Sequence, residues 1–383
     1  MKTGIITFHS ANNCGSMLQS YALQQQLDRL GFDNEIIDFA NAAQKHMYAL
    51  LRKPKNSHDV KYDLAALAYY SRFRTHYYDY RKFLSEKLRL SSNSYENSNE
   101  LAETNQLYGA FVAGSDQVWN ICCTDADDAY FLNFVDDEKI KIAYAPSFGA
   151  TKISDHPEKM DKYTKYLNRF DFLSIRENNG AAWIKEMTGR TAPVLIDPTM
   201  FLSKSDYMVL ADEEKPIDEK YIFYYAFNYA DSVNEVVKKI SESLHMPVYV
   251  MDAKGWVKNC KKFNFRLTKN SGPITFLNML LNAELVLTTS FHGTVFSIIG
   301  EKKFCFLNSS MHNDRDDRTS TLLTMFNLMD HFVDCSTIEN NENFNRVICD
   351  EWDFNDAKSL LDAQRKKAVN YLSDAFNHEK EEK

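Results

Sequence analysis

The first forty residues alternate a short apolar strand, a polar loop, a helix and a second apolar strand. The strands are expected over residues 4–8 and 35–39, and the helix over residues 18–30, ending before Gly31. A strand, a helix and a strand in this order pair in parallel through a right-handed crossover. This opening unit constrains the chain to begin as a Rossmann-like α/β domain.

The same alternation continues through the first half of the chain. Residues 44–105 are predicted to form a mainly helical, polar excursion without a strand. After it, strands are expected over residues 110–113, 141–145, 172–175 and 194–199.

A second series of strands and helices follows a charged stretch near residue 205. Its strands are expected over residues 221–227, 247–251, 284–288 and 303–307, and its helices over residues 232–244, 273–282 and from about residue 292. A chain of 383 residues is long enough for two cores. We therefore expect two Rossmann-like domains, residues 1–205 and 206–383, that face a cleft in a glycosyltransferase-B-like architecture, with a C-terminal helix at the end of the second.

The chain is acidic, with a formal net charge of -8. Such a charge repels nucleic acid and anionic lipid headgroups, so no nucleic-acid partner is expected. An anionic substrate would need cations placed locally around it.

The seven Cys residues include no Cys-x-x-Cys pair, which indicates reduced thiols and no metal site of that kind. The N-terminus has no signal-peptide pattern, and no run approaches the roughly 20 apolar residues that span a bilayer. We expect a cytoplasmic protein, and peripheral contact with the inner face of the membrane stays open.

Polar side chains follow several of the expected strands. In doubly wound sheets, the loops at the carboxyl ends of the strands line one ligand crevice. We expect a common rim formed by Asn12, Asn13, Ser115, Asp116, Ser147 and Arg176.

The segment 289–294 joins an apolar strand to an apolar helix. A helix N-terminus offers unpaired N–H groups and a positive dipole end, to which hydroxyl side chains add donors. This pattern indicates a phosphate site at Ser290, His292, Gly293 and Thr294. The alternative is that Ser290 or Thr289 only caps the helix and that His292 packs beside it.

Three side chains of the first half are further candidates. Arg176 follows an expected buried strand and can grip a carboxylate with two hydrogen bonds, or can instead pair with Glu177 or a helix end. Asp116 can serve as a base or bind a sugar diol, and the equal alternative is a helix cap. Trp119 is a candidate for stacking on a sugar.

The loop over residues 12–16 contains two adjacent amides. Asn12 and Asn13 supply donors and acceptors that suit sugar hydroxyls or a phosphate, although a plain turn with Asn13 as a helix cap explains them equally well. Neither a Gly-x-Gly-x-x-Gly fingerprint nor a Walker sequence occurs in the chain, which disfavours a dinucleotide or nucleoside triphosphate.

Taken together and in order, these segments resemble the landmarks of the polysaccharide pyruvyl transferase family over residues 3–330. The landmarks are GIITFHSANNCGSMLQ from Gly4, VAGSDQVWN from Val112, AYAPSFG from Ala143, SIRE from Ser174, LIDPT from Leu195 and TSFHGT from Thr289. Cys14 and the excursion at 44–105 depart from the family's pattern and bear on the acceptor.

The resemblance implies an enzyme that moves the pyruvyl group of phosphoenolpyruvate onto two hydroxyls of a sugar, forming a pyruvate ketal in a capsule or exopolysaccharide. His292 and Arg176 match the residues assigned to donor binding or catalysis. The acceptor would be a sugar or a lipid-linked oligosaccharide. No cofactor beyond the donor substrate and no metal is expected.

We interpret His292 as a phosphate contact and general acid, Arg176 as the clamp on the donor and Asp116 as a base or acceptor ligand. Arg318 and Arg315 add positive charge to the cleft, or else only pair with Asp314, Asp316 and Asp317. The rival functions are a nucleotide-sugar-dependent glycosyltransferase of the same fold and a non-catalytic protein that binds glycans or anions.

Overall fold

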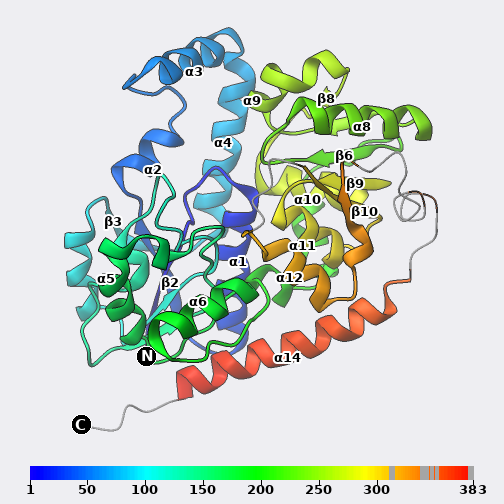
Figure 1. The fold of residues 1–383 in the computed structure, drawn as a ribbon. Coiled ribbons are helices and arrows are strands. Elements are labelled where there is room, and N and C mark those ends of the chain that lie inside the picture. Colours follow the sequence, from blue (N-terminus) through cyan, green and yellow to red (C-terminus); the bar gives the residue numbers. More distant parts are fainter. Residues whose placement is uncertain (310–314, 337–344, 346–348, 350–352, 378–383) are drawn as a thin grey trace.

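The protein folds into two α/β domains, each built around one parallel sheet (Figure 1). The computed structural model describes residues 1–309, 315–336, 345, 349 and 353–377. The first sheet has the strand order β3-β2-β1-β4-β5, and all of its pairs are parallel. Its strands are β1 (Thr3–Ile6), β2 (Asn34–Phe39), β3 (Leu90–Tyr95), β4 (Ala110–Ala113) and β5 (Ile140–Ala143).

The second sheet has the order β11-β10-β9-β6-β7-β8, again with parallel pairs only. Its central strand β9 is buried along its whole length, and β6 is buried up to its last residue, as expected where helices cover both faces of a sheet. Its strands are β6 (Ile222–Tyr225), β7 (Val248–Val250), β8 (Arg266–Leu267), β9 (Leu285–Thr288), β10 (Phe304–Asn308) and β11 (Phe332–Asp334).

Helix α1 (Cys14–Arg29) lies where the two domains meet. Its side chains Met17 and Leu18 belong to one apolar core with Phe276 of α10 (Gly272–Asn282) and Phe296 of α11 (Phe291–Ile299). Because α1 begins directly after the loop that follows β1, this packing brings the N-terminus of α1 close to that of α11.

The remaining helices cover the sheets or form the excursion between β2 and β3. No helix in the described part of the chain is long and apolar enough to cross a bilayer. Their bounds are α2 (Ala42–Met47), α3 (Ser57–Ala68), α4 (Tyr70–Lys87), α5 (Pro157–Asn168), α6 (Asn178–Thr188), α7 (Lys204–Ala211), α8 (Asp231–Leu244), α9 (Ala253–Gly255), α12 (Arg318–Met325) and α14 (Asn355–Asn377).

The C-terminal helix α14 runs along the lower side of both domains (Figure 1). We expected this helix within the second domain, but its last turns pack on the first. Tyr371 donates a hydrogen bond to the carbonyl of Ala143 at 2.9 Å, and the ring of Phe376 stacks on Phe32 with 4.3 Å between centroids. The helix therefore joins the two domains on the side away from α3.

Two expectations about the first domain were wrong. The excursion does contain a strand, β3, which pairs with β2 at the edge of the sheet. Its sequence, LSSNSY, is polar because the middle of this edge strand is exposed, so it carries no apolar signal. The expected strands at 172–175 and 194–199 reduce to isolated bridges, Ile142 with Phe172 and Ile175 with Val194. The flanking Pro193 and Pro198 lack the N–H that a longer ladder needs.

Candidate active site between the two domains

A buried cluster of charged side chains lies where the two domains meet. Arg176 follows the bridge at Ile175, and its side chain is 1% exposed. Its Nη1 donates to Oδ2 of Asp197 at 2.6 Å, and its Nη2 lies 3.7 Å from Oδ1 of Asp116. The guanidinium is thus held between two carboxylates.

Asp197 is the centre of this cluster. Its Oδ1 accepts hydrogen bonds from the backbone N–H and the hydroxyl of Thr199, at 3.0 and 2.7 Å. Burial disfavours its charge, but His292 and Arg176 outweigh burial and hold the pKa of Asp197 well below its usual range. Asp197 therefore carries a negative charge against both of these side chains.

His292 enters the cluster from the second domain. It lies in the first turn of α11, whose N-cap Ser290 accepts from the N–H of Gly293 at 3.4 Å. Its Nε2 is 3.4 Å from Oδ2 of Asp197, an ion-pair contact that makes no hydrogen bond. Arg176 and His292 therefore share one carboxylate across the domain boundary.

The close approach of α1 to α11 depends on Gly15. A Cβ atom at this position would lie 2.0 Å from Nδ1 of His292, so any larger residue would displace the imidazole. The N-cap of α1 is Asn13, whose side chain accepts from the N–H groups of Gly15 and Ser16. The positive ends of two helices thus meet beside His292.

Asp116 ties the cluster to α1. Its Oδ2 accepts from the hydroxyl of Ser16 at 2.5 Å, and its Oδ1 accepts from the N–H of Gln117 at 2.8 Å. Ser115, next to it, donates to the carbonyl of Ala145 at 2.5 Å and lies 3.4 Å from Oδ2 of Asp197. The loop after β4 therefore fixes one wall of the site.

Several donors in this cluster have no hydrogen-bond partner among the described residues. They are Nε and Nη2 of Arg176 and Nε2 of His292, and all three atoms are buried. A buried donor without a partner costs about 1–3 kcal/mol, and more when it is charged. Arg176 and His292 both face the carboxylate of Asp197. The donors that this carboxylate leaves without a hydrogen bond favour the binding of an anionic ligand.

A second arginine also lies near the ring of Phe291. The guanidinium carbon of Arg176 is 4.3 Å from the centroid of this ring, and that of Arg318 is 5.9 Å away. Arg318 also pairs with Asp316, with 2.6 Å between Nε and Oδ1. The structure thus shows the expected ion pair of Arg318, and a role for its charge in the site stays a prediction.

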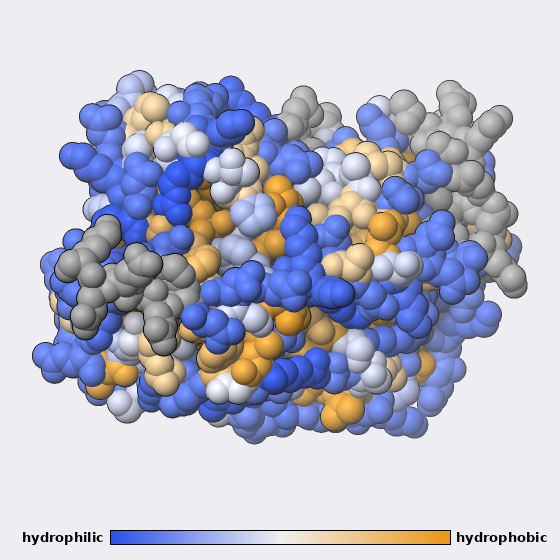
Figure 2. All heavy atoms as spheres, turned by 90° about the horizontal axis from the view of Figure 1, so that it is seen from below, coloured by the Kyte–Doolittle hydropathy of each residue, from blue (hydrophilic) through white to orange (hydrophobic). Residues whose placement is uncertain are grey.

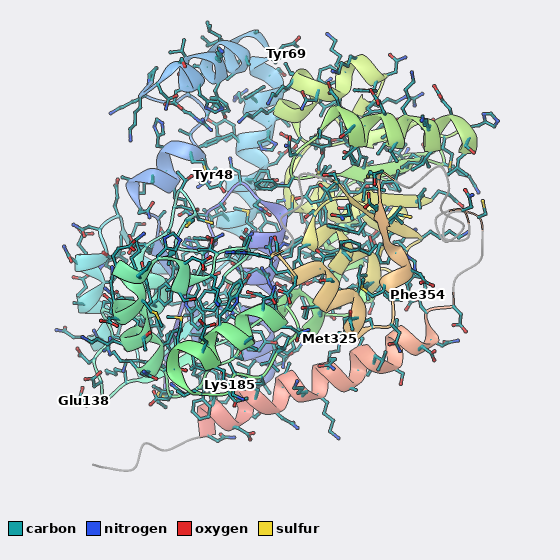
Figure 3. The ribbon with its side chains drawn as sticks, in the orientation of Figure 1. Tyr48, Tyr69, Glu138, Lys185, Met325 and Phe354 are labelled. Carbon is teal, nitrogen blue, oxygen red and sulfur yellow. The ribbon has the colours of Figure 1, made fainter. Side chains whose placement is uncertain are left out.

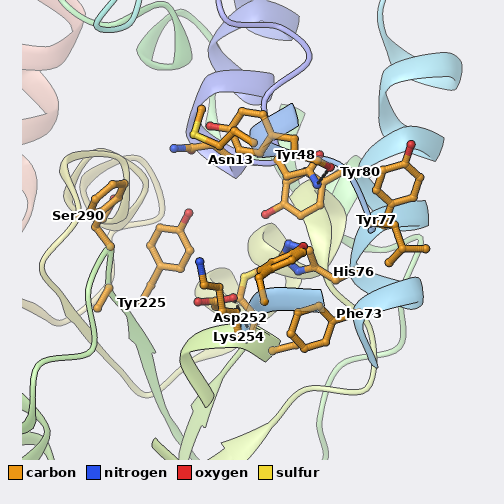
Figure 4. Close-up of a pocket in the computed structure, with 18 of the residues that line it drawn as sticks. Asn13, Tyr48, Phe73, His76, Tyr77, Tyr80, Tyr225, Asp252, Lys254 and Ser290 are labelled. Atoms are coloured by element: carbon orange, nitrogen blue, oxygen red, sulfur yellow. Dashed lines mark hydrogen bonds between the residues drawn. The ribbon is translucent and has the colours of Figure 1, made fainter. Parts of the chain in front are cut away.

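A cavity of about 330 Å³ opens beside Ser290 and Asn13 (Figure 4). The close-up shows Tyr225 and Ser290 on one side and the α4 side chains His76 and Tyr77 on the other. Its wall also carries charged groups from both sides of the boundary and an 88% exposed ring, namely Arg52, Asp252, Lys254 and Phe227.

The structure brings most of the residues selected from the sequence to this boundary. Arg176, Asp116, His292 and Ser115 meet in the cluster, and Asn12, Asn13 and Ser290 line the adjoining cavity. Asn12 is also fixed by Arg81, whose Nη2 donates to its Oδ1 at 2.9 Å.

Trp119 is the clear correction. Its side chain is fully buried, its Nε1 donates to the carbonyl of Tyr130 at 3.0 Å, and its ring stacks on Phe131. No face of this indole is open to a sugar. Its hydrogen-bonded N–H and its aromatic neighbours make it a core residue.

Other candidates serve the local structure. Thr294 is fully buried and its hydroxyl donates to the carbonyl of Ser290 at 3.2 Å, while a Cβ at Gly293 would lie 2.2 Å from Oγ1 of Thr288. Thr294 and Gly293 therefore support the turn into α11. Arg315 pairs with Asp155 on the surface, and Asp314 lies outside the described residues.

Asp197 was absent from the residues selected from the sequence. It had been noted only within the segment LIDPT, where an Asp before a Pro is typical of a turn or a cap. It does cap the short 3₁₀ helix Pro198–Phe201 through Oδ1, while its second oxygen faces Arg176 and His292. Only the tertiary structure shows that Asp197 contacts Arg176 and His292 in addition to capping this helix.

Comparison with known proteins gives two findings. The model of the family described as polysaccharide pyruvyl transferase matches residues 13–311, and no curated protein matches the sequence. Among solved structures, the UDP-GlcNAc 2-epimerase of Methanocaldococcus jannaschii in complex with UDP-GlcNAc and UDP is similar, with a TM-score of 0.53 and 13% identity over 97% of this chain and 99% of that one.

A second similar structure is the UDP-GlcNAc 2-epimerase of Neisseria meningitidis bound to UDP-GlcNAc, with a TM-score of 0.52 and 9% identity over 97% of this chain and 100% of that one. At these identities the likeness concerns the fold alone. It confirms the glycosyltransferase-B-like pair of α/β domains that the sequence predicted.

Proposed function

The chain belongs to the polysaccharide pyruvyl transferase family and is thus a transferase, and on this premise we propose that it moves the pyruvyl group of phosphoenolpyruvate onto two hydroxyls of a sugar. The product is a pyruvate ketal on a capsule or exopolysaccharide unit. Inorganic phosphate is the second product.

The observation that carries this proposal is the set of buried donors on Arg176 and His292 that make no hydrogen bond within the described residues. In phosphoenolpyruvate, the carboxylate and the phosphate ester oxygen are attached to the same carbon, C2. Nε and Nη2 of Arg176 have no hydrogen-bond partner in the part of the chain that the structure describes, and they offer two parallel N–H groups of the kind that carboxylates and phosphates accept. The unpaired N–H groups at the start of α11 add further donors beside His292.

In the proposed reaction, a proton is added to C3 of the donor, and the positive charge that forms at C2 is attacked by one sugar hydroxyl. The bond from C2 to the phosphate oxygen then breaks, and the second hydroxyl closes the ketal ring. Each hydroxyl gives up its proton. His292 is the proposed proton donor, because imidazole exchanges protons readily near neutral pH.

Asp197 and Asp116 have different proposed tasks. The Asp197 carboxylate stabilises a protonated His292 and holds Arg176 in place, and so it acts through these two side chains. Asp116 is the proposed base or acceptor ligand, since its Oδ1 lies at the same boundary, 3.7 Å from Arg176. Proton uptake and release are thus assigned to opposite domains.

The cavity beside Ser290 is the proposed site of the acceptor sugar. Its size falls in the range of small-molecule sites, and aromatic rings such as Tyr77 and Tyr225 suit the apolar faces of a pyranose. It adjoins the cluster through Asn13 and Ser290, so a sugar bound there would lie next to the donor.

The test is to incubate the protein with phosphoenolpyruvate and a galactoside or a lipid-linked sugar, to measure phosphate release, and to look for the mass gain of a pyruvate ketal. We expect both signals, and we expect them to persist in EDTA because the donor charge is met by side chains and helix ends. Turnover of UDP-sugars without any use of phosphoenolpyruvate would instead indicate a glycosyltransferase.

A further inference from the structure

The excursion between β2 and β3 forms one end of the molecule. Helix α3 lies across this end, far from α14, with α4 running down from it (Figure 1). Figure 3 labels Tyr69 at the turn between these helices, near α9, and Tyr48 deeper, toward the first domain. Helix α3 is therefore an outlying element whose two faces meet different surroundings.

The inner face of α3 is packed. Ala66 is fully buried and forms a small core with Phe73 of α4 and Ala253 of α9, and Tyr62 packs against this core. Tyr62 also lines the cavity beside Ser290. The inner face thus belongs to the wall of the proposed acceptor site.

The outer face of α3 is apolar but has no partner among the described residues. Val60, Leu64 and Leu67 are 44%, 62% and 58% exposed, and their spacing puts them on one side of the helix. Among the residues that the structure describes, eleven large hydrophobic side chains are exposed, and six of these fall within residues 51–78, the other members being Leu51, Tyr70 and Tyr78. This concentration is not what scattered surface residues produce.

The same segment is strongly basic in an acidic protein. Residues 51–78 contain 6 Lys or Arg and 2 Asp or Glu, a net charge of +4, so that the rest of the chain carries -12. Around α3, Lys53, Lys55 and Lys61 are exposed, and no ion pair within the described residues involves them. The nearby Asp59 is buried and is neutralised by Arg52 and His46.

We propose that the outer face of α3, with the preceding loop, docks on an anionic lipid bilayer. Apolar side chains at helical spacing flanked by lysines are the features by which a helix lies in the membrane interface. The net charge of the whole chain predicted repulsion from such a surface, but the charge is unevenly distributed, and α3 lies at its positive end. The opposite side of the molecule, seen in Figure 2, is largely hydrophilic.

This placement has a consequence for the acceptor that rests on the proposed function. The helix that would touch the membrane through Leu64 and Leu67 lines the cavity through Tyr62 on its inner side. A sugar carried on a membrane lipid would then reach the cavity with the enzyme docked. The acceptor class is accordingly a lipid-borne sugar.

The experiment is co-sedimentation of the full chain with vesicles of phosphatidylglycerol and phosphatidylcholine in equal parts. We expect binding that weakens with added salt, and little binding to vesicles of phosphatidylcholine alone. The variants are Leu64→Ser with Leu67→Ser, and Lys53→Gln with Lys55→Gln and Lys61→Gln. Each set should weaken binding by about tenfold or more.

Matched controls come from exposed residues elsewhere. Val209→Ser replaces a side chain that is 72% exposed, and Lys215→Gln with Lys220→Gln removes charges whose side chains are 82% and 77% exposed. These variants should bind vesicles as the unchanged protein does. Equal binding by the α3 variants, or no binding by the unchanged protein at low salt, overturns the proposal. So does self-association in solution that only the Leu64 and Leu67 variant loses.

The vesicle measurement needs no turnover, which separates it from the proposed function. With a water-soluble galactoside as acceptor, the α3 variants should form ketal at the unchanged rate. If no protein forms ketal but the vesicle results hold, the function is wrong and the docking surface stands.

Discussion

Arg176 shows how one side chain can join two domains without a covalent link. It belongs to the first domain, yet the carboxylate it binds also faces His292 of the second, at 2.6 and 3.4 Å respectively. In the interior, such contacts are stronger than at the surface, and a missing partner is correspondingly costly.

Replacement of Asp197 by Asn should reduce both stability and activity. It leaves Arg176 buried without its carboxylate, which costs about 3 kcal/mol or more, and it removes the charge that stabilises a protonated His292. We expect the midpoint of urea unfolding to move to a lower urea concentration, and we expect turnover to be about a hundredfold slower. The exposed Asp218→Asn is the control.

The same variant gives a pH test. Because the pKa of Asp197 is held below its usual range, its stabilising contribution is present above about pH 4, near the ordinary pKa, and is lost as the pH falls further. The unchanged protein should therefore lose more stability between pH 5 and pH 3 than Asp197→Asn does, by about 1 kcal/mol, and the rest of the contribution should be lost only at lower pH. Equal losses would contradict the assigned ion pair.

Gly15→Ala should damage the site with little effect elsewhere. The added Cβ would lie 2.0 Å from Nδ1 of His292 and must shift the imidazole, and a displacement of that size slows catalysis by about a hundredfold. The control is Gly31→Ala, where nothing lies within 4 Å and only the left-handed backbone is strained. If turnover by Gly15→Ala matches that control, His292 is not held where catalysis needs it.

At the scale of single elements, the start of α6 holds a buried carboxylic acid. Glu177 is the N-cap residue of α6, and its Oε1 accepts from the N–H of Phe148 at 2.8 Å. Burial raises the pKa of Glu177 to about 7, against the opposing effect of Arg176 and Arg318. The folded protein therefore keeps this proton over a range in which the unfolded chain has lost it.

Because the folded protein holds this proton more tightly than the unfolded chain does, the free energy of unfolding should decrease as the pH rises from about 4.5 to 7, by up to about 3 kcal/mol. Glu177→Gln stays neutral at every pH and should remove that part of the slope, as measured by urea unfolding at pH 5 and pH 7.5. An unchanged slope would mean that Glu177 is ionised in the folded protein at both values.

Helix α14 provides a prediction about packing. Leu372 is fully buried on the face that crosses to the first domain, so Leu372→Ala should destabilise the protein by about 2–5 kcal/mol. Lys366→Ala, on the exposed face of the same helix, should change stability by less than about 0.5 kcal/mol. A thermal unfolding scan of both variants isolates the packing contribution, because Ala has the highest helix propensity and so neither replacement weakens the helix itself.

The elements also show what a single sequence reveals. Apolar strands such as β1, β4, β6 and β9 were predictable, because strands buried on both faces consist of apolar residues. The polar edge strand β3 was not, and neither were the bridges beside Pro193 and Pro198, where a strand-like composition lacks N–H donors. Pairing at an edge depends on neighbours that are distant in the chain.

At the scale of the whole molecule, most residues of the site could be predicted from the sequence, but its central carboxylate, Asp197, could not. The residues after β-strands converge because parallel strands end at one edge, so Arg176, Asp116 and His292 were selected correctly as neighbours. Asp197 was missed because a local cap explained it, and Trp119 was misjudged because burial cannot be read from its polar neighbours.

Net charge was misleading in the same way. The value of -8 averages a basic stretch around α3 and an acidic remainder, and only the structure shows that the exposed Lys53, Lys55 and Lys61 accompany the exposed apolar face of α3 at one end of the molecule. The three-dimensional distribution of charge, rather than its sum, bears on which surfaces the protein meets.

The measurement that tests the central claim most directly is calorimetric titration of phosphoenolpyruvate into the full chain and into its Arg176→Ala and His292→Ala variants, with Arg315→Ala as the surface control. The account predicts saturable binding by the unchanged protein and by the control, and a loss of about tenfold or more in affinity in each of the two site variants. Unchanged affinity in both site variants would contradict the assignment of the donor site to the boundary between the domains.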